Sequence, residues 1–304
     1  MELNISLLIP TLNAGAVWQE ILQSVNNQKV KLKRKIIIDS GSSDDTVAIA
    51  RQFGFTVIEI DKSEFNHGKT RQQLVDLSTD TDICVFLTQD AILASPDSIA
   101  NLVSVFDDSE IGIAYGRQLP HKNARILESH ARMYNYPDQS HVRSFMDKDA
   151  FGFKVFFCSN SFAAYRRSTL SAVGGFPSDS IMGEDAIVAA KMLMAGFKKA
   201  YVANAAVYHS HSYTLNEEFK RYFDTRVFHE QNEWIVQNYG KPIGEGLSFM
   251  KSELRYVLKN SPTTIFKSIA SLGAKWLGYK SGGLYKKLPV SVLRKVSMHK
   301  HHWV

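Results

Sequence analysis

The first candidate for a chemical role is Asp90, an aspartate that follows shortly after an apolar run. Residues 83–87 (ICVFL) have the length and composition of a buried strand, and Thr88, Gln89 and Asp90 follow directly. Ligands of open α/β sheets bind at the carboxyl ends of strands, where one or two carboxylates suffice for a hard cation that phosphates also hold. The alternative is that Asp90 only begins a turn, in which Asp is common.

Two adjacent acids, Glu184 and Asp185, are the second such feature. They follow Gly183 and open an amphipathic helical pattern that runs through Ile187 and Met192. A carboxylate so placed can act as a general base, which takes the proton of an attacking hydroxyl. The simpler interpretation is that both acids favour the N-terminus of a helix through its dipole.

Three potential cations, His67, Lys69 and Arg71, lie together after a further strand-like run. A diphosphate leaving group gathers negative charge as its bond breaks, and Arg or Lys side chains stabilise that charge. The alternative is a basic turn in solvent. Asp39 ends another strand-like run, where its carboxylate can accept a hydrogen bond from a pyrimidine N–H, or can simply belong to the turn before a helix.

Strand-like and helix-like segments alternate through the first half of the chain. The strand-like runs are residues 5–9, 36–38, 56–60 and 83–87, and a further strand is expected over residues 156–167. One intervening helix is expected to carry Trp18, Ile21, Leu22 and Val25 on one face, and another to cover residues 47–53. This alternation predicts an α/β fold with a mainly parallel sheet and helices on both faces.

The composition is that of a folded protein of the reducing cytosol. Of the 304 residues, 44% are hydrophobic and 22% are charged. Cys84 and Cys158 lie in apolar segments, without a CxxC pair or a disulfide framework. The chain enters a strand-like run soon after Met1, so no signal peptide is expected, and no apolar stretch is long enough to span a bilayer.

The net charge of +6 is concentrated in the C-terminal part. From Lys241 onward there are 12 Lys and Arg residues against Glu245 and Glu253, a balance of +10 that leaves −4 for the remainder. Such a basic tail suits nucleic acid or an anionic membrane surface.

The same tail has an amphipathic helical pattern. Ile265, Ile269, Leu272 and Trp276 recur at helical spacing, with Lys267, Lys275 and Lys280 nearby. A basic amphipathic helix with Trp is typical of membrane-surface binding. The alternative is a helical cap on the catalytic domain with a solvated basic face.

Two common nucleotide-binding motifs do not match. The place of a G-x-G-x-x-G fingerprint after the first strand holds residues 10–13 (PTLN). Gly68-Lys69-Thr70 looks like the end of a P-loop, but Ser63 stands where the first glycine of that loop belongs. NAD enzymes and P-loop ATPases are therefore not expected.

Four segments in order resemble family 2 glycosyltransferases, which are inverting enzymes with the GT-A fold and nucleotide-sugar donors. They are residues 10–13 (PTLN), 38–46 (IDSGSSDDT), 87–90 (LTQD) and 183–185 (GED), and the resemblance covers roughly residues 3 to 215. Residues 65–71 (FNHGKTR), with Gln89, Asp90 and Ala91, are most similar to the rhamnosyltransferase branch, whose donor is dTDP-L-rhamnose. The resemblance implies a GT-A catalytic domain over residues 1–215, with a donor half over 1–115 and an acceptor half over 116–215, and a C-terminal helical region over 216–304.

The resemblance also implies roles for single residues. Thr11, Asn13 and Asp39 are implied to bind the nucleotide. The other implied donor-binding residues are Asn66, His67, Gly68, Arg71, Gln89 and Asp90. An inverting transfer needs one general base, and Asp185 is implied in that role, with Glu184 assisting it or binding the acceptor.

A divalent cation is the cofactor that the resemblance implies. Asp90 aligns with the second acid of the family's D-x-D motif, which usually holds Mg²⁺ or Mn²⁺ on the diphosphate, whereas Thr88 replaces the first acid. In related enzymes a histidine at the place of His209 can complete the site, and Mn²⁺ tolerates imidazole better than Mg²⁺ does. The alternative for His209 is a structural role.

These implications predict transfer of L-rhamnose from dTDP-L-rhamnose to a sugar hydroxyl of a lipid-linked glycan, in O-antigen or related surface polysaccharide synthesis. The enzyme is expected in the cytoplasm, peripheral at the inner face of the cell membrane, with anionic lipid rather than nucleic acid as the partner of its tail. Two alternatives stay open. One is another nucleotide sugar, a UDP-hexose or UDP-GlcNAc, and the other is a catalytically inactive binding module.

Overall fold

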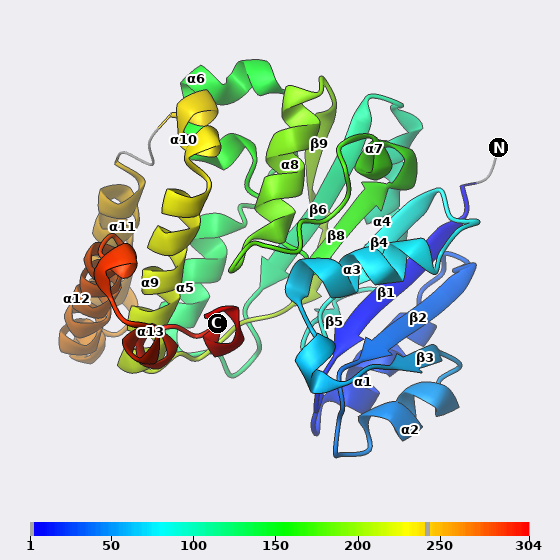
Figure 1. The fold of residues 1–304 in the computed structure, drawn as a ribbon, viewed down its shortest axis with the longest axis horizontal. Coiled ribbons are helices and arrows are strands. Elements are labelled where there is room, and N and C mark those ends of the chain that lie inside the picture. Colours follow the sequence, from blue (N-terminus) through cyan, green and yellow to red (C-terminus); the bar gives the residue numbers. More distant parts are fainter. Residues whose placement is uncertain (1–2, 241–243, 304) are drawn as a thin grey trace. The chain divides into compact units, whose positions relative to one another are not determined.

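The apolar run at residues 83–87 forms β4, a central strand of a nine-stranded sheet in the computed structural model (Figure 1). The structure describes residues 3–240 and 244–303. The strand order is β3-β2-β1-β4-β8-β6-β9-β5, and β7 pairs with β9. The strands are β1 (Ile5–Thr11), β2 (Arg34–Asp39), β3 (Thr56–Glu59), β4 (Ile83–Leu87), β5 (Ile92–Leu93), β6 (Ile111–Leu119), β7 (His141–Arg143), β8 (Phe162–Arg166) and β9 (Lys198–Tyr208).

The sheet is parallel in its N-terminal half and mixed beyond it. Strands β3, β2, β1 and β4 run parallel, which brings their carboxyl ends to one edge and sets Thr11 opposite Asp39. Strand β8 then runs antiparallel to both β4 and β6, whereas β6 and β9 are parallel. The predicted α/β class and the parallel order of the first four strands are therefore confirmed.

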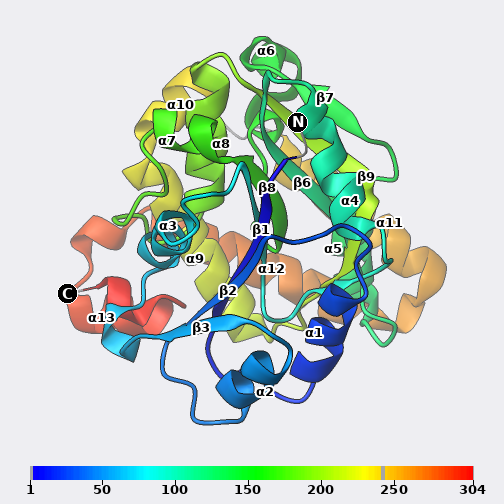
Figure 2. The same cartoon turned by 90° about the vertical axis from the view of Figure 1, so that its right-hand side faces the viewer.

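Helices cover both faces of this sheet, as Figure 2 shows for α1 and α4 on one side and α3 and α8 on the other. Side chains alternate along β1, so that Leu7 and Ile9 contribute to the same apolar core as Trp18 and Ile21 of α1. The helices here are α1 (Trp18–Asn26), α2 (Thr46–Gln52), α3 (His67–Asp76), α4 (Ser98–Val103), α6 (Lys148–Phe151), α7 (Arg167–Ala172) and α8 (Glu184–Met194). The predicted buried face of α1 is confirmed.

The strand predicted over residues 156–167 was wrong in its first half. Strand β8 covers only Phe162–Arg166, residues 156–161 are turn or irregular structure, and Arg167 already begins α7. The reason lies in Ser159 and Asn160, whose side chains or backbone groups form hydrogen bonds with Gln118, Asp185 and Glu184 rather than with a neighbouring strand in register. Polar side chains that offer the backbone such alternative partners disfavour a regular strand.

The chain divides into two compact units. The first comprises Met1–Leu119, Tyr136–Ser178 and Glu184–His209 and contains the sheet. The second comprises Pro120–Asn135, Asp179–Gly183 and Ser210–Val304 and is helical. The domain limits expected at residues 115 and 215 stay predictions, while the helical character of the C-terminal region is confirmed.

The second unit is built around two long helices that pack along each other, α9 and α12. Its helices are α5 (Ile126–Asn135), α9 (Leu215–Gln231), α10 (Glu233–Tyr239), α11 (Glu245–Asn260), α12 (Ile265–Gly282) and α13 (Val290–Val296). Thr214 and Glu217 form a capping box that starts α9. None of the helices in the described ranges has the length and apolar character needed to cross a membrane.

Candidate active site

Asp39 is a buried carboxylate at the carboxyl end of β2. Its oxygens accept hydrogen bonds from the hydroxyls of Thr11 (2.8 Å) and Ser42 (2.6 Å) and from the backbone N–H groups of Gly41 (3.1 Å) and Ser42 (2.8 Å). Gly41 has φ +87°, a left-handed conformation that lets the chain fold back over the carboxylate. Because these donors come from Thr11 on β1 and from the turn after β2, the carboxylate of Asp39 holds the ends of the two strands together.

Asn13 joins the loops that follow β1 and β2. Its side-chain oxygen accepts a hydrogen bond from the N–H of Ser43 (2.8 Å), and its own N–H donates to the hydroxyl of Ser42 (2.7 Å). Asn13 has φ +47°, a conformation that Asn tolerates better than most residues. The two predicted nucleotide-binding loops thus form one surface.

Gln89 ties the end of β4 to the end of β1. Its side-chain amide bonds the backbone of Leu12 twice, as an acceptor from the N–H (2.7 Å) and as a donor to the carbonyl (2.9 Å). Both functional groups of the amide are therefore engaged with the chain itself. Gln89 holds the residue after it, Asp90, beside the loop of β1.

Asp90 and His209 meet at the ends of β4 and β9. The Nε2 atom of His209 lies 3.3 Å from Oδ1 of Asp90, and the histidine is buried whereas the aspartate is partly exposed. On the other side of the ring, Nδ1 lies 2.9 Å from the amide oxygen of Gln118. The amide nitrogen of Gln118 donates to Ser159 Oγ (2.8 Å), which fixes the orientation of that amide.

This arrangement determines which ring nitrogen faces Asp90. An amide oxygen only accepts, so Nδ1 of His209 carries the proton, and in a neutral ring Nε2 then presents a lone pair to the carboxylate. Two electron-rich atoms 3.3 Å apart repel unless a proton or a cation lies between them. A histidine whose second nitrogen is held by an outer partner is the usual form of a metal ligand.

The residues present therefore fit a divalent cation. Asp90 and His209 each offer one ligand atom. Thr88 stands where a second acid is expected, and its hydroxyl oxygen is buried with no hydrogen-bond partner among the described residues.

Asp185 lies in the first turn of α8 and is half-buried. One carboxylate oxygen accepts from the N–H of Asn160 (3.0 Å) and the other from the N–H of Ala186 (2.8 Å). Burial and the neighbouring charge of Glu184 raise the pKa of Asp185 to about 6. A carboxylate with a pKa near 6 is ionised at neutral pH and is still basic enough to take a proton in a transition state.

Glu184 is buried and forms its own set of polar contacts. Its Oε1 atom lies 2.9 Å from the guanidinium of Arg71 and accepts from the side-chain amide of Asn160 (3.2 Å). Burial alone would raise the pKa of Glu184, but the positive charge of Arg71, aided by His67, lowers it. Arg71 is thus engaged with Glu184 and with the carbonyl of His67 (3.0 Å).

The segment of Asn66, His67 and Gly68 begins α3 against residues 177–178. The side chain of Asn66 caps the helix and donates to the carbonyl of Ser178 (2.9 Å). Gly68 packs so closely that a Cβ would lie 1.7 Å from the carbonyl oxygen of Pro177. Burial lowers the pKa of His67, and Lys69 is exposed, so the three expected cations have three different environments.

Residues 159–161 connect the surroundings of His209, Asp185 and Thr88. This role was not predicted from the sequence. Ser159 accepts from Gln118, which orients His209, and the N–H of Asn160 holds Asp185. The carbonyl of Ser161 accepts from the N–H of Thr88 at the end of β4 (3.3 Å). The polar run Ser159-Asn160-Ser161 inside an apolar segment could have indicated a functional role for these residues. No pattern in the sequence around Gln118 indicated that this residue would orient His209.

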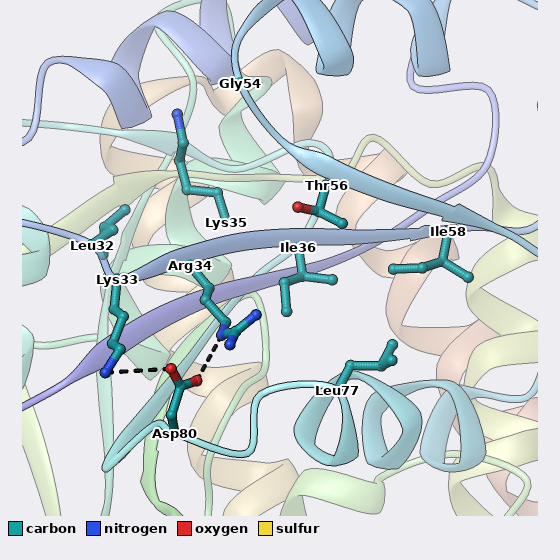
Figure 3. A pocket seen from close by; sticks show the side chains of 10 residues that line it. All are labelled: Leu32, Lys33, Arg34, Lys35, Ile36, Gly54, Thr56, Ile58, Leu77 and Asp80. Atoms are coloured by element: carbon teal, nitrogen blue, oxygen red, sulfur yellow. Dashed lines mark hydrogen bonds and ion pairs between the residues drawn. The ribbon is translucent and has the colours of Figure 1, made fainter.

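A separate cavity lies at the other end of the strands (Figure 3). Its lining includes Arg34, which begins β2, and Thr56, which begins β3, whereas Asp39 ends β2. Lys33 and Arg34 both bind Asp80, at 3.3 Å and 2.6 Å. The cavity is therefore not continuous with the site at the carboxyl ends, and its lining cations are engaged.

The sequence matches known proteins along nearly its whole length. The family model described as glycosyl transferase family 2 matches residues 6–174. The O-antigen chain rhamnosyltransferase RfbN of Salmonella typhimurium is 48% identical over 99% of this chain and 96% of that protein. The O-antigen chain rhamnosyltransferase WbaN of Salmonella anatum is 46% identical over 98% of this chain and 95% of that protein.

Solved structures share the fold at much lower identity. The mannosyltransferase PcManGT from Pyrobaculum calidifontis, in complex with GDP-Man and Mn²⁺, has a TM-score of 0.62 and 16% identity, covering 99% of this chain and 87% of that one. S. aureus TarS 1-349 in complex with UDP-GlcNAc has a TM-score of 0.55 and 11% identity, covering 93% and 92%. At these identities the likeness concerns the fold alone, and the predicted GT-A fold is confirmed.

Proposed function

The chain belongs to glycosyl transferase family 2, and we propose that it transfers L-rhamnose from dTDP-L-rhamnose to a sugar hydroxyl of an O-antigen or related surface polysaccharide. Two relatives that are 48% and 46% identical are named O-antigen chain rhamnosyltransferases, which supports rhamnose as the sugar. The main observation in favour of the proposal is that one set of hydrogen bonds links three candidate functional groups. The buried Asp39, the facing pair Asp90 and His209, and Asp185 are linked through Gln89 and residues 159–161.

In this proposal Thr11, Asn13 and Asp39 bind the nucleotide. The loops after β1 and β2 offer hydroxyl, amide and backbone groups around a buried carboxylate, which suits the N–H and carbonyl edge of a pyrimidine. The thymine or uracil base alone would not separate dTDP-linked from UDP-linked donors, because both present the same imide edge. Gln89 contributes by holding the loop of β1.

Asp90 and His209 would hold a divalent cation. A cation bound there supplies positive charge to the diphosphate as it departs. Gln118 keeps His209 in the tautomer that presents Nε2, and Ser159 keeps Gln118 in place. Arg71 is committed to Glu184, whereas Lys69 of the same segment is exposed and is the cation that we propose binds the phosphates, with His67 at the start of the same helix.

Asp185 acts as the general base. The acceptor hydroxyl gives its proton to the Asp185 carboxylate while its oxygen forms a bond to the anomeric carbon of rhamnose. The bond from that carbon to the diphosphate breaks, and dTDP leaves with the electron pair. A single displacement of this kind inverts the anomeric centre, from a β-linked donor to an α-rhamnoside.

A donor competition assay tests the proposed specificity. Purified protein is given equal concentrations of dTDP-L-rhamnose, UDP-glucose and UDP-GlcNAc, with Mn²⁺ and a lipid-linked acceptor that ends in a sugar hydroxyl. Predominant incorporation of rhamnose is expected. Preferred incorporation of glucose or GlcNAc would refute the rhamnose donor, and no incorporation from any donor would favour a catalytically inactive binding module.

We also propose that the acceptor is linked to a lipid and that the enzyme works at the inner face of the cell membrane. The basic C-terminal part supports this, because cytoplasmic leaflets carry anionic lipids. Comparing a lipid-linked glycan with the same glycan released from its lipid tests the point. A lower KM for the lipid-linked form at the surface of vesicles is expected, and equal KM values would argue against it.

A further inference from the structure

Helix α12 (Ile265–Gly282) is amphipathic in the reverse of the usual sense. Its buried positions are small or polar, namely Ser268, Ser271, Gly278 and Gly282. Its most exposed apolar side chains are Phe266 (81%), Trp276 (61%), Ile269 and Leu277. A helix that packs by its apolar stripe would show the opposite pattern. The core of the second unit therefore leaves these four side chains, the α12 stripe, in solvent.

The orientation of α12 is fixed by close contact with α9. A Cβ at Gly278 would lie 2.1 Å from the carbonyl oxygen of Phe219, and one at Gly282 would lie 2.5 Å from that of Phe223. Only glycine permits the two backbones to approach in this way. The helix cannot rotate the α12 stripe inward without losing this contact, so the exposure of the stripe is built into the packing.

The α12 stripe forms one elongated apolar face. Its members lie at helical spacing from Phe266 to Leu277, and Lys280 extends the face by a further turn. At about 1.5 Å per residue, the distance along the axis from Phe266 to Lys280 is about 21 Å. The ammonium of Lys280 lies 5.9 Å from the centre of the Trp276 ring, so a cation borders the apolar surface directly. Contiguous exposed apolar faces of this kind mark interaction sites.

The chain from α12 to its last residue carries charge of one sign. After Glu253 the sequence contains 10 Lys and Arg residues and no Asp or Glu. Lys275, which the sequence suggested as part of a basic face, is instead mostly buried and pairs with Glu218 (3.6 Å) and Glu253 (3.4 Å). Lys267, Lys280, Lys286 and Lys287 are exposed, on α12 itself or within five residues of its end, and Lys280 contacts the stripe at Trp276.

We propose that the α12 stripe binds an anionic lipid bilayer, with α12 lying in the plane of the interface. Apolar side chains with Trp on one face and flanking lysines are the features that bind a helix to such a surface. A second copy of this chain is a poorer partner, because both copies would bring the same positive charge. Nucleic acid is a poorer partner too, because phosphates would leave the apolar side chains unused. This inference names the surface behind the membrane location proposed above and does not depend on the donor or on the base.

Vesicle sedimentation tests the proposal with the full-length protein. Binding is expected to vesicles of phosphatidylcholine mixed with phosphatidylglycerol, with much weaker binding to phosphatidylcholine alone and a decrease in high salt. The double variant Phe266→Ser/Trp276→Ser is expected to bind at least about 10-fold more weakly, since it removes the two most exposed apolar side chains of the stripe from the interface. The matched control is Leu247→Ser/Leu258→Ser on α11, whose side chains are similarly exposed (60% and 57%). The control is expected to bind like the wild type.

A second readout locates the contact. Lipids brominated in their acyl chains quench tryptophan that enters the bilayer, and quenching is expected in the wild type but not in Trp276→Phe. Unchanged binding by the α12 double variant, or equal loss in the α11 control, would overturn the proposal. A dimer in solution that the α12 double variant converts to a monomer, without lipid binding by the wild type, would assign the stripe to a second copy instead. Transfer to a soluble acceptor is expected to be unchanged in the α12 double variant, so failure here is distinct from failure of the proposed reaction.

Discussion

The guanidinium of Arg71 on α3 lies 2.9 Å from the buried carboxylate of Glu184, the first residue of α8. This pair gives two adjacent acids different properties. Arg71 and His67 lower the pKa of Glu184 against the effect of burial, whereas burial and the charge of Glu184 raise the pKa of Asp185 to about 6. Two carboxyl groups whose environments separate their pKa values take different roles in catalysis.

The variant Glu184→Gln is expected to shift the acidic limb of the pH profile of kcat to lower pH. Removing the negative charge beside Asp185 lowers the pKa of Asp185, so the base is ionised at a lower pH. The amide of Gln can still accept from Arg71 and Asn160, which preserves the geometry. The measurement is kcat between pH 4.5 and 8 (about the range that spans the pKa) with saturating donor.

Two outcomes of that experiment would contradict the assignment. Loss of activity at every pH in a folded Glu184→Gln protein would mean that Glu184 itself contacts a substrate. An unchanged acidic limb would mean that Asp185 is not the titrating base. The control is Glu110→Gln, which changes an exposed glutamate paired with Lys198 and is expected to leave the profile unchanged.

Binding of Mn²⁺ is expected to raise the melting temperature of the wild type and not of Asp90→Asn or His209→Ala. Both variants remove one of the two facing ligand atoms. Gln118→Leu is expected to weaken Mn²⁺ binding by about 10- to 100-fold, because the ring of His209 loses the partner of Nδ1. An equal Mn²⁺ shift in the wild type and in all three variants would place the metal elsewhere, and Asp107→Asn, at an exposed position, serves as the control.

The variant Gly68→Ala is expected to destabilise the protein by about 1–3 kcal/mol, the usual cost of overpacking. The added methyl group would meet the carbonyl of Pro177 at 1.7 Å, so α3 and the residues around Arg71 must shift. Gly246 is a matched control, because it is also the second residue of a helix but faces open space. Gly246→Ala is expected to stabilise by about 0.5–1 kcal/mol, and equal effects of the two changes in urea denaturation would contradict the account.

Asp224 gives the second unit a pH-dependent stability. It is fully buried on α9, and burial raises its pKa to about 6 although it accepts a hydrogen bond from the N–H of Met298 (2.8 Å). In the unfolded chain an aspartate has a pKa of about 3.9. The folded protein therefore holds a proton that the unfolded chain has lost, and this stabilisation is present below about pH 4 and disappears as the pH rises through 6.

The variant Asp224→Asn is thus expected to be more stable than the wild type at pH 7, with the difference vanishing near pH 4. The measurement is the free energy of unfolding of the wild type and of Asp224→Asn, obtained by denaturation at several pH values. A wild type more stable than Asp224→Asn at pH 7, by as much as at pH 4, would contradict the stated direction.

Part of the site was predictable because its residues follow a regular pattern. Parallel strands bring their carboxyl ends to one edge, so the ends of β2 and β4 predicted the place of Asp39 and Asp90. Thr88, between Leu87 and Asp90, was equally visible as the missing acid. These inferences need only the strand pattern and the residue that ends each strand.

Other features depend on contacts between distant parts of the chain. No local sequence pattern predicts that Arg71 forms an ion pair with Glu184 instead of binding a phosphate. Nor does one predict that the side-chain amide of Gln89 forms hydrogen bonds with the backbone of Leu12. For α12 the spacing predicted an amphipathic helix, but periodicity does not say which face is buried. The buried face of α12 is determined by the close approach of its backbone to α9 at Gly278 and Gly282.

The most direct test of the central claim compares transfer and donor binding in Asp185→Asn. The amide keeps an acceptor for the N–H of Asn160 but takes no proton from a hydroxyl. General-base catalysis contributes about 10²- to 10⁴-fold, so kcat is expected to fall by that factor while the dissociation constant for dTDP-L-rhamnose, measured by calorimetry, stays near that of the wild type. Near-normal turnover by the folded variant would show that Asp185 is not the base.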